Sequence, residues 1–382
     1  MSQLSADERR SLVNLAEEPV GLDEALGVVV RPIGSDFDAL GEAPASFSWR
    51  DKDGRDWLMP IRNQSMCGSC AAFGLTGLLE LQVKVDLGEP GLDIDLSDSH
   101  CLTCSGGDCD EAISLSDGLA TMITEGLPTE SCAPYLQGGV GQVILTPCDE
   151  GCDGVDRGRV YLDRTERLQF DEELTLAEQV AAMQTAMLEG PLLVRLSVWD
   201  DLFSYTDGVY ANAVSDPELR LGYHALLLVG WDDDRQAWLA RNSWGDDWGE
   251  EGYLWLGYGA AESHVLVFRA LGTDARRLYD MDRDGRAATE HGGVDCDDYD
   301  PSIRPGREDV WLDGIDQDCD GEDGEDALED GRSASGGLAC SQLPGRTLSG
   351  SGVFLLALLS GFFALAGRSN SMLEAANDDD IC

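Results

Sequence analysis

One cysteine in this chain is accompanied by the other residues that nucleophilic thiol chemistry needs. A cysteine nucleophile requires a base, a group that orients the base, and donors for the oxyanion that forms during attack. Cys70 closes the run NQSMCGSC, and Gln64 stands in the same run. Far downstream come His224 in GYHALLLVGW and Asn242 in RNSWG. These residues predict a nucleophile (Cys70), its base (His224), an orienting amide (Asn242) and an oxyanion donor (Gln64).

The elements that must position these residues can be predicted from the spacing of apolar side chains. Residues 69–87 and 112–126 have helical spacing, and the first helix would begin beside Cys70. Strand-like patterns cover residues 191–199, 223–231, 237–242 and 252–258. A helix N-terminus and a neighbouring imidazolium both favour a thiolate, so we expect a lowered pKa for Cys70.

Around these residues, over about 45–270, the chain resembles the papain-like (cathepsin) cysteine peptidases. The stretch GPLLVRLSVWDDLFSYTDGVY is most like the cathepsin B branch. The resemblance implies an α+β fold with a helical lobe, a β-rich lobe and an active site between them. It also implies hydrolysis of polypeptide substrates with no cofactor in the catalysis. By the same resemblance, Trp244 would line the cleft and shield the Asn242–His224 contact.

The resemblance further places charged residues along the substrate cleft. Asp110 and Glu111 stand where the family has a glycine pair, which would disfavour acidic substrate residues nearby. Arg195 stands where many relatives have a small residue, in the pocket for the second substrate residue before the scissile bond. A guanidinium facing that pocket could accept an acidic or polar side chain, whereas the alternative is an arginine that points to solvent or forms a structural pair. No histidine pair like that of the cathepsin B occluding loop occurs in 101–152, which favours endopeptidase activity.

Two other functions share this sequence pattern. A papain-like fold could serve as a catalytically inactive surface binding module. The same thiol could instead transfer acyl groups to amines.

Composition limits the partners and the compartment. The chain of 382 residues has 73 acidic and 26 basic side chains, for a formal net charge of −47. Nucleic acid and anionic membrane surfaces are poor partners for such a charge, whereas basic or neutral polypeptides are suitable ones. We expect a monomer. The 12 cysteines indicate disulfides and therefore an oxidising compartment.

The papain pattern implies particular disulfide pairs. The expected bridges in the peptidase region are Cys67–Cys109, Cys104–Cys148 and Cys132–Cys152, with Cys101 unassigned. A zinc site formed by Cys101, Cys104 and Cys109 is the competing interpretation.

The chain is expected to contain six parts. They are an N-terminal extension or short propeptide (1–44), the peptidase domain (45–272), an acidic metal-binding segment (278–325), a linker (326–351), an apolar helix (352–367) and a tail (368–382). Residues 5–26 could form one or two short helices. No signal peptide is visible, which conflicts with the expected disulfides, so we expect the true start to lie upstream.

The acidic segment resembles a metal-binding motif of secreted bacterial proteins, through its pattern D-C-D-D-x-D-P followed by D-G-I-D-x-D-C-D-G. Dense oxygen ligands suit Ca²⁺ better than transition metals, so we expect Ca²⁺ within 280–323. Cys296 and Cys319 are expected to bridge. The alternative is an acidic, solvated linker. The candidate ligands are Asp280, Asp282, Asp284, Asp295, Asp297, Asp300, Asp316, Asp318 and Asp320.

Residues 352–367 form an uncharged apolar run followed by Arg368. The run is slightly shorter than the ~20 residues of a membrane-spanning helix. With Cys340 before it and arginine after it, the run resembles the C-terminal sorting tags of myxobacterial surface proteins. We therefore expect a transmembrane or sorting helix that tethers the enzyme at the cell envelope or extracellular surface, with a buried core helix as the alternative.

Overall fold

The computed structural model describes residues 4–18, 28–34, 43–138, 141–151, 159–212, 216–260, 263, 266–274, 286, 294–297, 300–310 and 314–321. The chain separates into two units, Met1–Asp326 and Ala327–Cys382, and the described residues all lie in the first. The described helices are α1 (Ala6–Leu12), α3 (Cys70–Leu87), α4 (Asp98–Cys104), α5 (Leu115–Thr124) and α6 (Leu176–Met187), with 3-10 turns η2 (Asp200–Ser204) and η3 (Pro217–Leu219). The described strands are β1 (Val29–Ile33), β2 (Ser46–Ser48), β3 (Leu136–Gln137), β4 (Val143–Ile144), β5 (Thr165–Phe170), β6 (Leu192–Val198), β7 (Val209–Tyr210), β8 (Gly222–Asp232), β9 (Ala237–Arg241), β10 (Tyr253–Gly257) and β11 (Val267–Ala270).

A long mixed sheet carries half of the candidate site. Its strand order is β1-β5-β11-β6-β8-β9-β10-β7, and β2 pairs with β8 outside this path. The central strands β6, β8 and β9 are almost entirely buried, and helices α3 and α6 (Leu176–Met187) pack on β6 and β8. The four predicted strands correspond to β6, β8, β9 and β10, so those predictions are confirmed.

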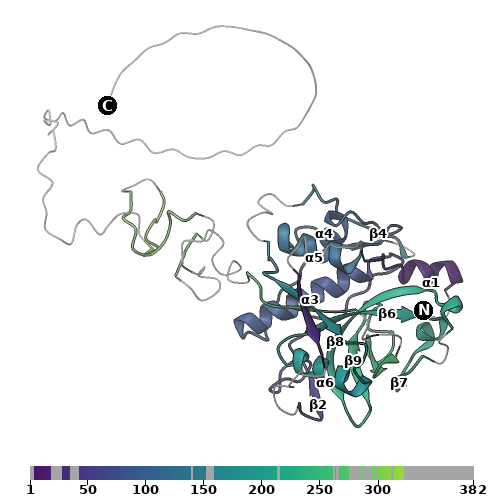
Figure 1. The fold of residues 1–382 in the computed structure, drawn as a ribbon. Coiled ribbons are helices and arrows are strands. Elements are labelled where there is room, and N and C mark those ends of the chain that lie inside the picture. The colour runs from purple at the N-terminus through teal and green to yellow at the C-terminus, as the bar shows by residue number, and fades with distance from the viewer. Residues whose placement is uncertain are drawn as a thin grey trace, which may run out of the picture. The chain divides into compact units, whose positions relative to one another are not determined.

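Helix α3 is the central element of the helical part. It begins at Cys70, directly after the N-cap residue Ser69, and ends before Gly88, whose φ of 70° lies in the left-handed region. Nearly all of its side chains are buried, because α4 and α5 pack on it as well as β8 (Figure 1). A Cβ at Gly74 would lie 2.7 Å from Leu193 Cδ1, so a larger residue here would have to displace the Leu193 side chain between helix and sheet. The predicted helices at 69–87 and 112–126 are therefore confirmed as α3 and α5.

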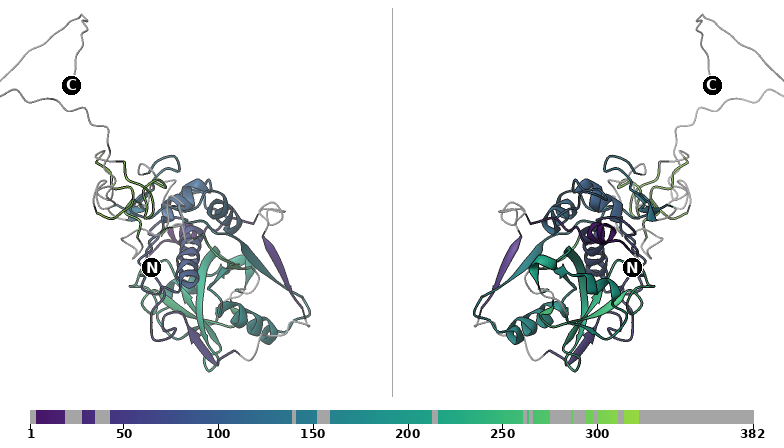
Figure 2. Two further views of the ribbon diagram at one scale, coloured as in Figure 1. Left: turned by 90° about the vertical axis from the view of Figure 1, so that its left-hand side faces the viewer. Right: turned by 90° about the vertical axis from the view of Figure 1, so that its right-hand side faces the viewer.

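The N-terminal residues form one short helix and then an extended segment. Ser5 and Glu8 form a reciprocal capping box that starts α1. After α1 the chain continues into the molecule, where Leu12 and Val13 are fully buried and Leu15 is 5 % exposed. Further along the chain, β1 adds to the sheet in parallel with β5, at the edge visible in Figure 2.

Disulfides join the predicted partners in three cases. The bridges Cys67–Cys109, Cys104–Cys148 and Cys296–Cys319 are present. Cys132 is also disulfide-bonded, and its predicted partner Cys152 lies outside the described residues. The zinc interpretation is wrong, because the sulfurs of Cys104 and Cys109 are already bonded to other cysteines.

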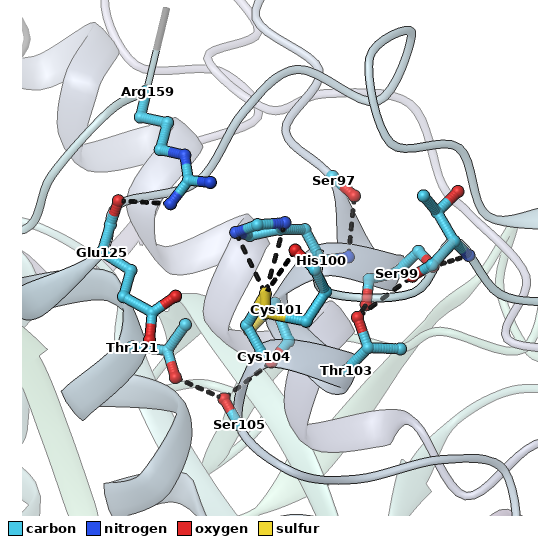
Figure 3. The surroundings of a disulfide bond; sticks show 12 residues. Ser97, Ser99, His100, Cys101, Thr103, Cys104, Ser105, Thr121, Glu125 and Arg159 are labelled. Atoms are coloured by element: carbon cyan, nitrogen blue, oxygen red, sulfur yellow. Dashed lines mark hydrogen bonds between the residues drawn. A yellow bond between two sulfur atoms is a disulfide. The ribbon is translucent and has the colours of Figure 1, made fainter. Parts of the chain in front are cut away.

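The Cys104–Cys148 bridge has a histidine against it. The ring nitrogens of His100 lie 3.4 and 3.3 Å from Cys104 Sγ, as Figure 3 shows. Both residues belong to α4, one turn apart, so the ring covers the sulfur from the same helix face. This bridge fixes α4 to the segment after β4.

The predicted linker at 326–351 and the apolar run at 352–367 lie outside the described residues. Within the part of the chain that the structure describes, no helix has the length and apolar character that a membrane span requires.

Candidate active site

The candidate nucleophile is the first residue of α3 and is completely buried. The loop before it is held by the Cys67–Cys109 bridge and by the Gly68 amide, which donates to Cys109 O at 3.0 Å. Burial raises the pKa of the Cys70 thiol to about 11, although backbone N–H groups of Ala225 and Ala71 act in the opposite direction. The expected lowering of this pKa is therefore wrong for the chain as folded here, because removal of water outweighs the helix N-terminus.

The candidate base is held by the amide predicted for that role. His224 Nε2 lies 2.7 Å from Asn242 Oδ1, which also accepts the Ser243 N–H at 2.8 Å. Since that oxygen accepts, Nε2 carries the proton and Nδ1 keeps a lone pair. Nδ1 is buried and hydrogen-bonds to no described residue. The site thus contains a neutral imidazole whose free nitrogen can take a proton.

Burial lowers the pKa of His224, and the Trp244 indole lies against its ring. Burial lowers the pKa of His224 to about 4, and the hydrogen bond to Asn242 opposes that shift. The Trp244 ring lies 4.8 Å from the His224 ring and stacks on Phe203 at 4.8 Å. Trp244 therefore covers the His224–Asn242 contact, and it also lines a neighbouring pocket of about 420 Å³ with Phe203 and Trp248.

The elements that bring the nucleophile and base together are α3 and β8, which pack against each other. A Cβ on Gly74, one turn after Cys70, would lie 3.4 Å from Ala225 Cβ, and Ala225 follows His224 in β8. The loop that leads to α3 is anchored by Arg62, whose guanidinium pairs with the buried carboxylates of Glu80 at 3.0 Å and Asp98 at 3.1 Å.

Gln64 is buried beside both elements and its amide orientation is fixed. Its Oε1 accepts from Ser243 Oγ at 2.6 Å, and its Nε2 donates to Cys67 O at 2.8 Å and to Leu12 O at 3.1 Å. Sequence analysis did not single out Ser243, although its place directly after Asn242 in the NSWG run was an available signal. Ser243 positions the amide so that its N–H groups, rather than its oxygen, face the N-terminal segment.

The N-terminal segment therefore reaches the predicted oxyanion donor. Beyond Leu12, the Leu15 amide donates to Tyr223 O at 3.2 Å, and Asn14 Nδ2 donates to Asp110 O at 3.2 Å. A Cβ on Gly222 would lie 2.3 Å from Val13 O, so the segment is in close contact with the start of β8. The segment crosses the site in contact with residues on both sides of it.

Both flanks of this segment are tied down as well. On one side Arg9 pairs with Asp200 and lies 5.6 Å from the Phe203 ring centroid. On the other side Glu18 accepts the N–H groups of the first residues of α5, Leu115 and Ser116, each at 3.1 Å. The carboxylate thus satisfies donors at a helix N-terminus. Sequence analysis did not predict these contacts, because no local pattern indicates them.

The remaining residues predicted to line the cleft differ in their surroundings. The side chains of Asp110 and Glu111 are exposed. Arg195 on β6 is partly buried, and its guanidinium carbon lies 4.3 Å from the Tyr223 ring centroid. Arg195 pairs with Ala225 in the β6–β8 ladder, so its side chain lies on the face of Tyr223 and Ala225, and the His224 side chain lies on the other face.

A separate candidate metal centre lies in the acidic segment. One carboxylate oxygen from each of four aspartates falls within 4.8 Å of the others; these are Asp309, Asp316, Asp318 and Asp320. Asp309 was not predicted, and its Oδ1 accepts the Gln317 and Asp318 amides at 2.7 and 3.0 Å. The predicted ligands Asp295, Asp297 and Asp300 lie outside this group, and Asp280, Asp282 and Asp284 lie outside the described residues.

Comparison with known proteins agrees with this geometry. A family model described as papain family cysteine protease matches residues 43–267, so the chain belongs to that family. A second model, a Cu-binding MopE-like metal-binding motif, matches residues 295–325. The protein is thus a cysteine peptidase, a hydrolase with a papain-like α+β fold.

Relatives and solved structures are of the cathepsin type. Cathepsin B-like CP1 of Giardia intestinalis is 29% identical, over 65% of this chain and 75% of that protein. Cathepsin K of Gallus gallus is 30% identical, over 59% of this chain and 63% of that protein. The solved proCathepsin B S9 from Trypanosoma congolense has a TM-score of 0.56 and 21% identity, and the likeness covers 70% of this chain and 88% of that one. At this identity the last comparison shows the fold alone.

Proposed function

We propose that this protein is an endopeptidase that hydrolyses polypeptides through Cys70, His224 and Asn242. The observation that carries the proposal is the buried imidazole, which is bonded to Asn242 through Nε2 and has a free Nδ1 beside the Cys70 helix. In the proposed reaction the Cys70 proton moves to His224 Nδ1, and the thiolate attacks the substrate carbonyl carbon. The C–N bond breaks as His224 returns that proton to the departing amine.

The oxyanion and the second half of the reaction use the same groups. Gln64 Nε2 donates to the oxyanion, and Ser243 keeps the amide in that orientation. Water then attacks the thioester with His224 as base, which releases the acid and restores the thiol. Asn242 holds the imidazole in the required tautomer throughout. No step of this scheme requires a cofactor.

The chain as folded here supports a latent form of the enzyme. Leu12 O takes the Gln64 donor that the oxyanion would need, and Leu12, Val13 and Leu15 bury apolar side chains over the site. We define residues 5–18 as the cleft segment. A substrate carbonyl can reach Gln64 only after this segment leaves, so residues 1–44 act as a short inhibitory propeptide.

The aspartates of the acidic segment fit a calcium site. Asp309, Asp316, Asp318 and Asp320 supply only hard oxygen ligands, which Ca²⁺ prefers, and the Cys296–Cys319 bridge closes the loops that carry them. Bound Ca²⁺ would neutralise these carboxylates and stabilise the loops. Calorimetric titration of the full chain with Ca²⁺ should show binding that is lost in Asp316→Asn with Asp318→Asn. Preferential binding of Cu²⁺, or no binding, would contradict the assignment.

The apolar run at 352–367 supports attachment at the cell envelope, because its length and lack of charge approach those of a membrane-spanning helix. Membrane fractionation of cells that produce the full chain tests this part. A protein found entirely in the soluble fraction would contradict the tether.

The experiment that tests the catalytic proposal is hydrolysis of internally quenched peptides by the full chain. Cys70→Ala should abolish cleavage, whereas Cys101→Ala, which alters the other described free thiol, should retain it. Addition of an amine nucleophile separates hydrolysis from acyl transfer, since a transferase would yield mainly the amide of that amine. An intact fold with no cleavage and no Cys70 reactivity would favour the inactive binding module.

A further inference from the structure

Two arginines stack on the tyrosine that precedes the candidate base. The guanidinium carbons of Arg195 and Arg220 each lie 4.3 Å from the Tyr223 ring centroid. The three residues come from β6, from the turn after η3 and from β8, and all three are partly buried. A ring face attracts a guanidinium plane and leaves its N–H edge available for other partners. The arrangement holds two cations against one ring.

This cluster, Arg195–Arg220–Tyr223, adjoins the cleft segment through Tyr223. In the β6–β8 ladder Arg195 pairs with Ala225, and Ser197 pairs with Tyr223, so Arg195, Tyr223 and Ala225 share one face of the sheet. That face meets α3, because a Cβ on Gly74 of α3 would lie 3.4 Å from Ala225 Cβ. The carbonyl of Tyr223 accepts the Leu15 amide of the cleft segment at 3.2 Å. A substrate in the same place would bring side chains to the two guanidinium groups.

Neither cation has a carboxylate partner within the described residues. By contrast, Arg9, Arg62, Arg235 and Arg269 each form an ion pair there. This contrast is informative in a chain with 73 acidic and 26 basic residues, where carboxylates are plentiful. Residues 11–16 of the cleft segment, SLVNLA, bring no charge to the cluster either. The cluster therefore contains two cations that no described carboxylate neutralises.

We propose that Arg195 and Arg220 form a subsite for an acidic substrate side chain, which the family resemblance of Arg195 assigns to the second residue before the scissile bond. The inference rests on the proposed peptidase function and names its substrate class: polypeptides with Glu or Asp at that position. A carboxylate can accept two parallel N–H bonds from one guanidinium, a geometry that a neutral amide cannot match. An acidic substrate also gains a contact that the uncharged residues 11–16 of the cleft segment lack, and so competes better for the site.

The test compares fluorogenic peptides that are identical except for Glu, Gln or Leu at that position. All are assayed on one preparation of the full chain. The fraction of molecules from which the cleft segment has left the site is then the same for every peptide, so it cancels from each ratio of kcat/KM. Hydrogen bonds to charged groups predict a Glu-to-Gln ratio of roughly 10 to 100. Arg195→Gln with Arg220→Gln should bring the ratio near one. Arg235→Gln should leave it unchanged, since Arg235 stacks on Trp255 at 4.6 Å and pairs with Asp232.

A Glu-to-Gln ratio near or below one in the wild type would overturn the subsite, as would a ratio that survives the double substitution. Each single variant, Arg195→Gln and Arg220→Gln, is also assayed, and alkylation of Cys70 reports whether each variant retains its site. Cleavage of the Leu peptide without an acidic preference would overturn this inference alone. No cleavage of any peptide and no alkylation of Cys70 would overturn the proposed function, and the inference with it.

Discussion

Replacement of Leu12 by alanine should open the cleft. Leu12 is fully buried over the site, and its carbonyl accepts the Gln64 amide. The side chain is buried only while the cleft segment is in place, so its truncation destabilises the closed form and leaves the open form almost unaffected. The expected result is a more reactive enzyme rather than a weaker one.

The magnitude follows from the burial of this side chain. Leucine-to-alanine substitutions at buried positions cost about 2–5 kcal/mol, and the lower part of that range suits a segment that can readjust in its cleft. A loss of about 2–3 kcal/mol raises the open fraction roughly 30- to 150-fold, at 1.36 kcal/mol for each factor of ten. The initial rate of peptide cleavage should rise by the same factor while the open form remains the minor one.

The assay measures initial rates of peptide hydrolysis by full chains before any N-terminal processing, which mass spectrometry verifies. Leu219→Ala is the matched control, because this side chain is 60 % exposed and the change should alter the rate by no more than about twofold. A Leu12→Ala rate equal to that of the control, with the fold intact, would refute the inhibitory role of the cleft segment.

Three further predictions concern the site and the acidic segment. His224 should remain neutral at pH 6 in the intact chain, because burial lowers its pKa from 6.5 to about 4. The folded chain should lose stability as the pH falls from 6.5 to about 4, since the unfolded chain takes up the proton first. An imidazolium signal in the NMR spectrum at pH 6 would contradict this prediction. Ser243→Ala should lower kcat about 3- to 10-fold with little change in KM, since the Gln64 amide loses its hydrogen bond, and an unchanged kcat would exclude the positioning role. Chelation of Ca²⁺ should accelerate reduction of the Cys296–Cys319 bridge and leave the rate of peptide cleavage unchanged, as followed by thiol trapping; equal reduction rates with and without chelator would argue against the calcium site.

The fold and the elements that carry the candidate site residues were predictable because their signals are local. The apolar spacing after Cys70 indicated the helix that became α3, and the patterns around His224 and Asn242 indicated β8 and β9. The candidate residues of the site all lie on or beside these elements. The predicted role of Trp244 also agrees with its position against the His224 ring.

What could not be predicted depends on contacts between distant segments. The cleft segment meets Gln64 and Tyr223, and no spacing rule connects those parts of the chain. The pKa of Cys70 was misjudged for a related reason, because the burial that dominates its environment arises from tertiary packing. Asp309 was missed because it stands outside the aspartate-rich runs, although the folded loop brings it to Asp316, Asp318 and Asp320.

The most direct test of the central claim is labelling of the full chain by an epoxide inhibitor of papain-type enzymes, with the modified residue mapped by mass spectrometry. Cys101 is an internal control, because it is also a free, buried thiol and burial raises its pKa. The account predicts modification of Cys70 alone, more rapid in Leu12→Ala and strongly reduced in His224→Ala. No modification of Cys70 in the folded Leu12→Ala chain, or equal modification of Cys70 and Cys101, would contradict Cys70 as the activated nucleophile.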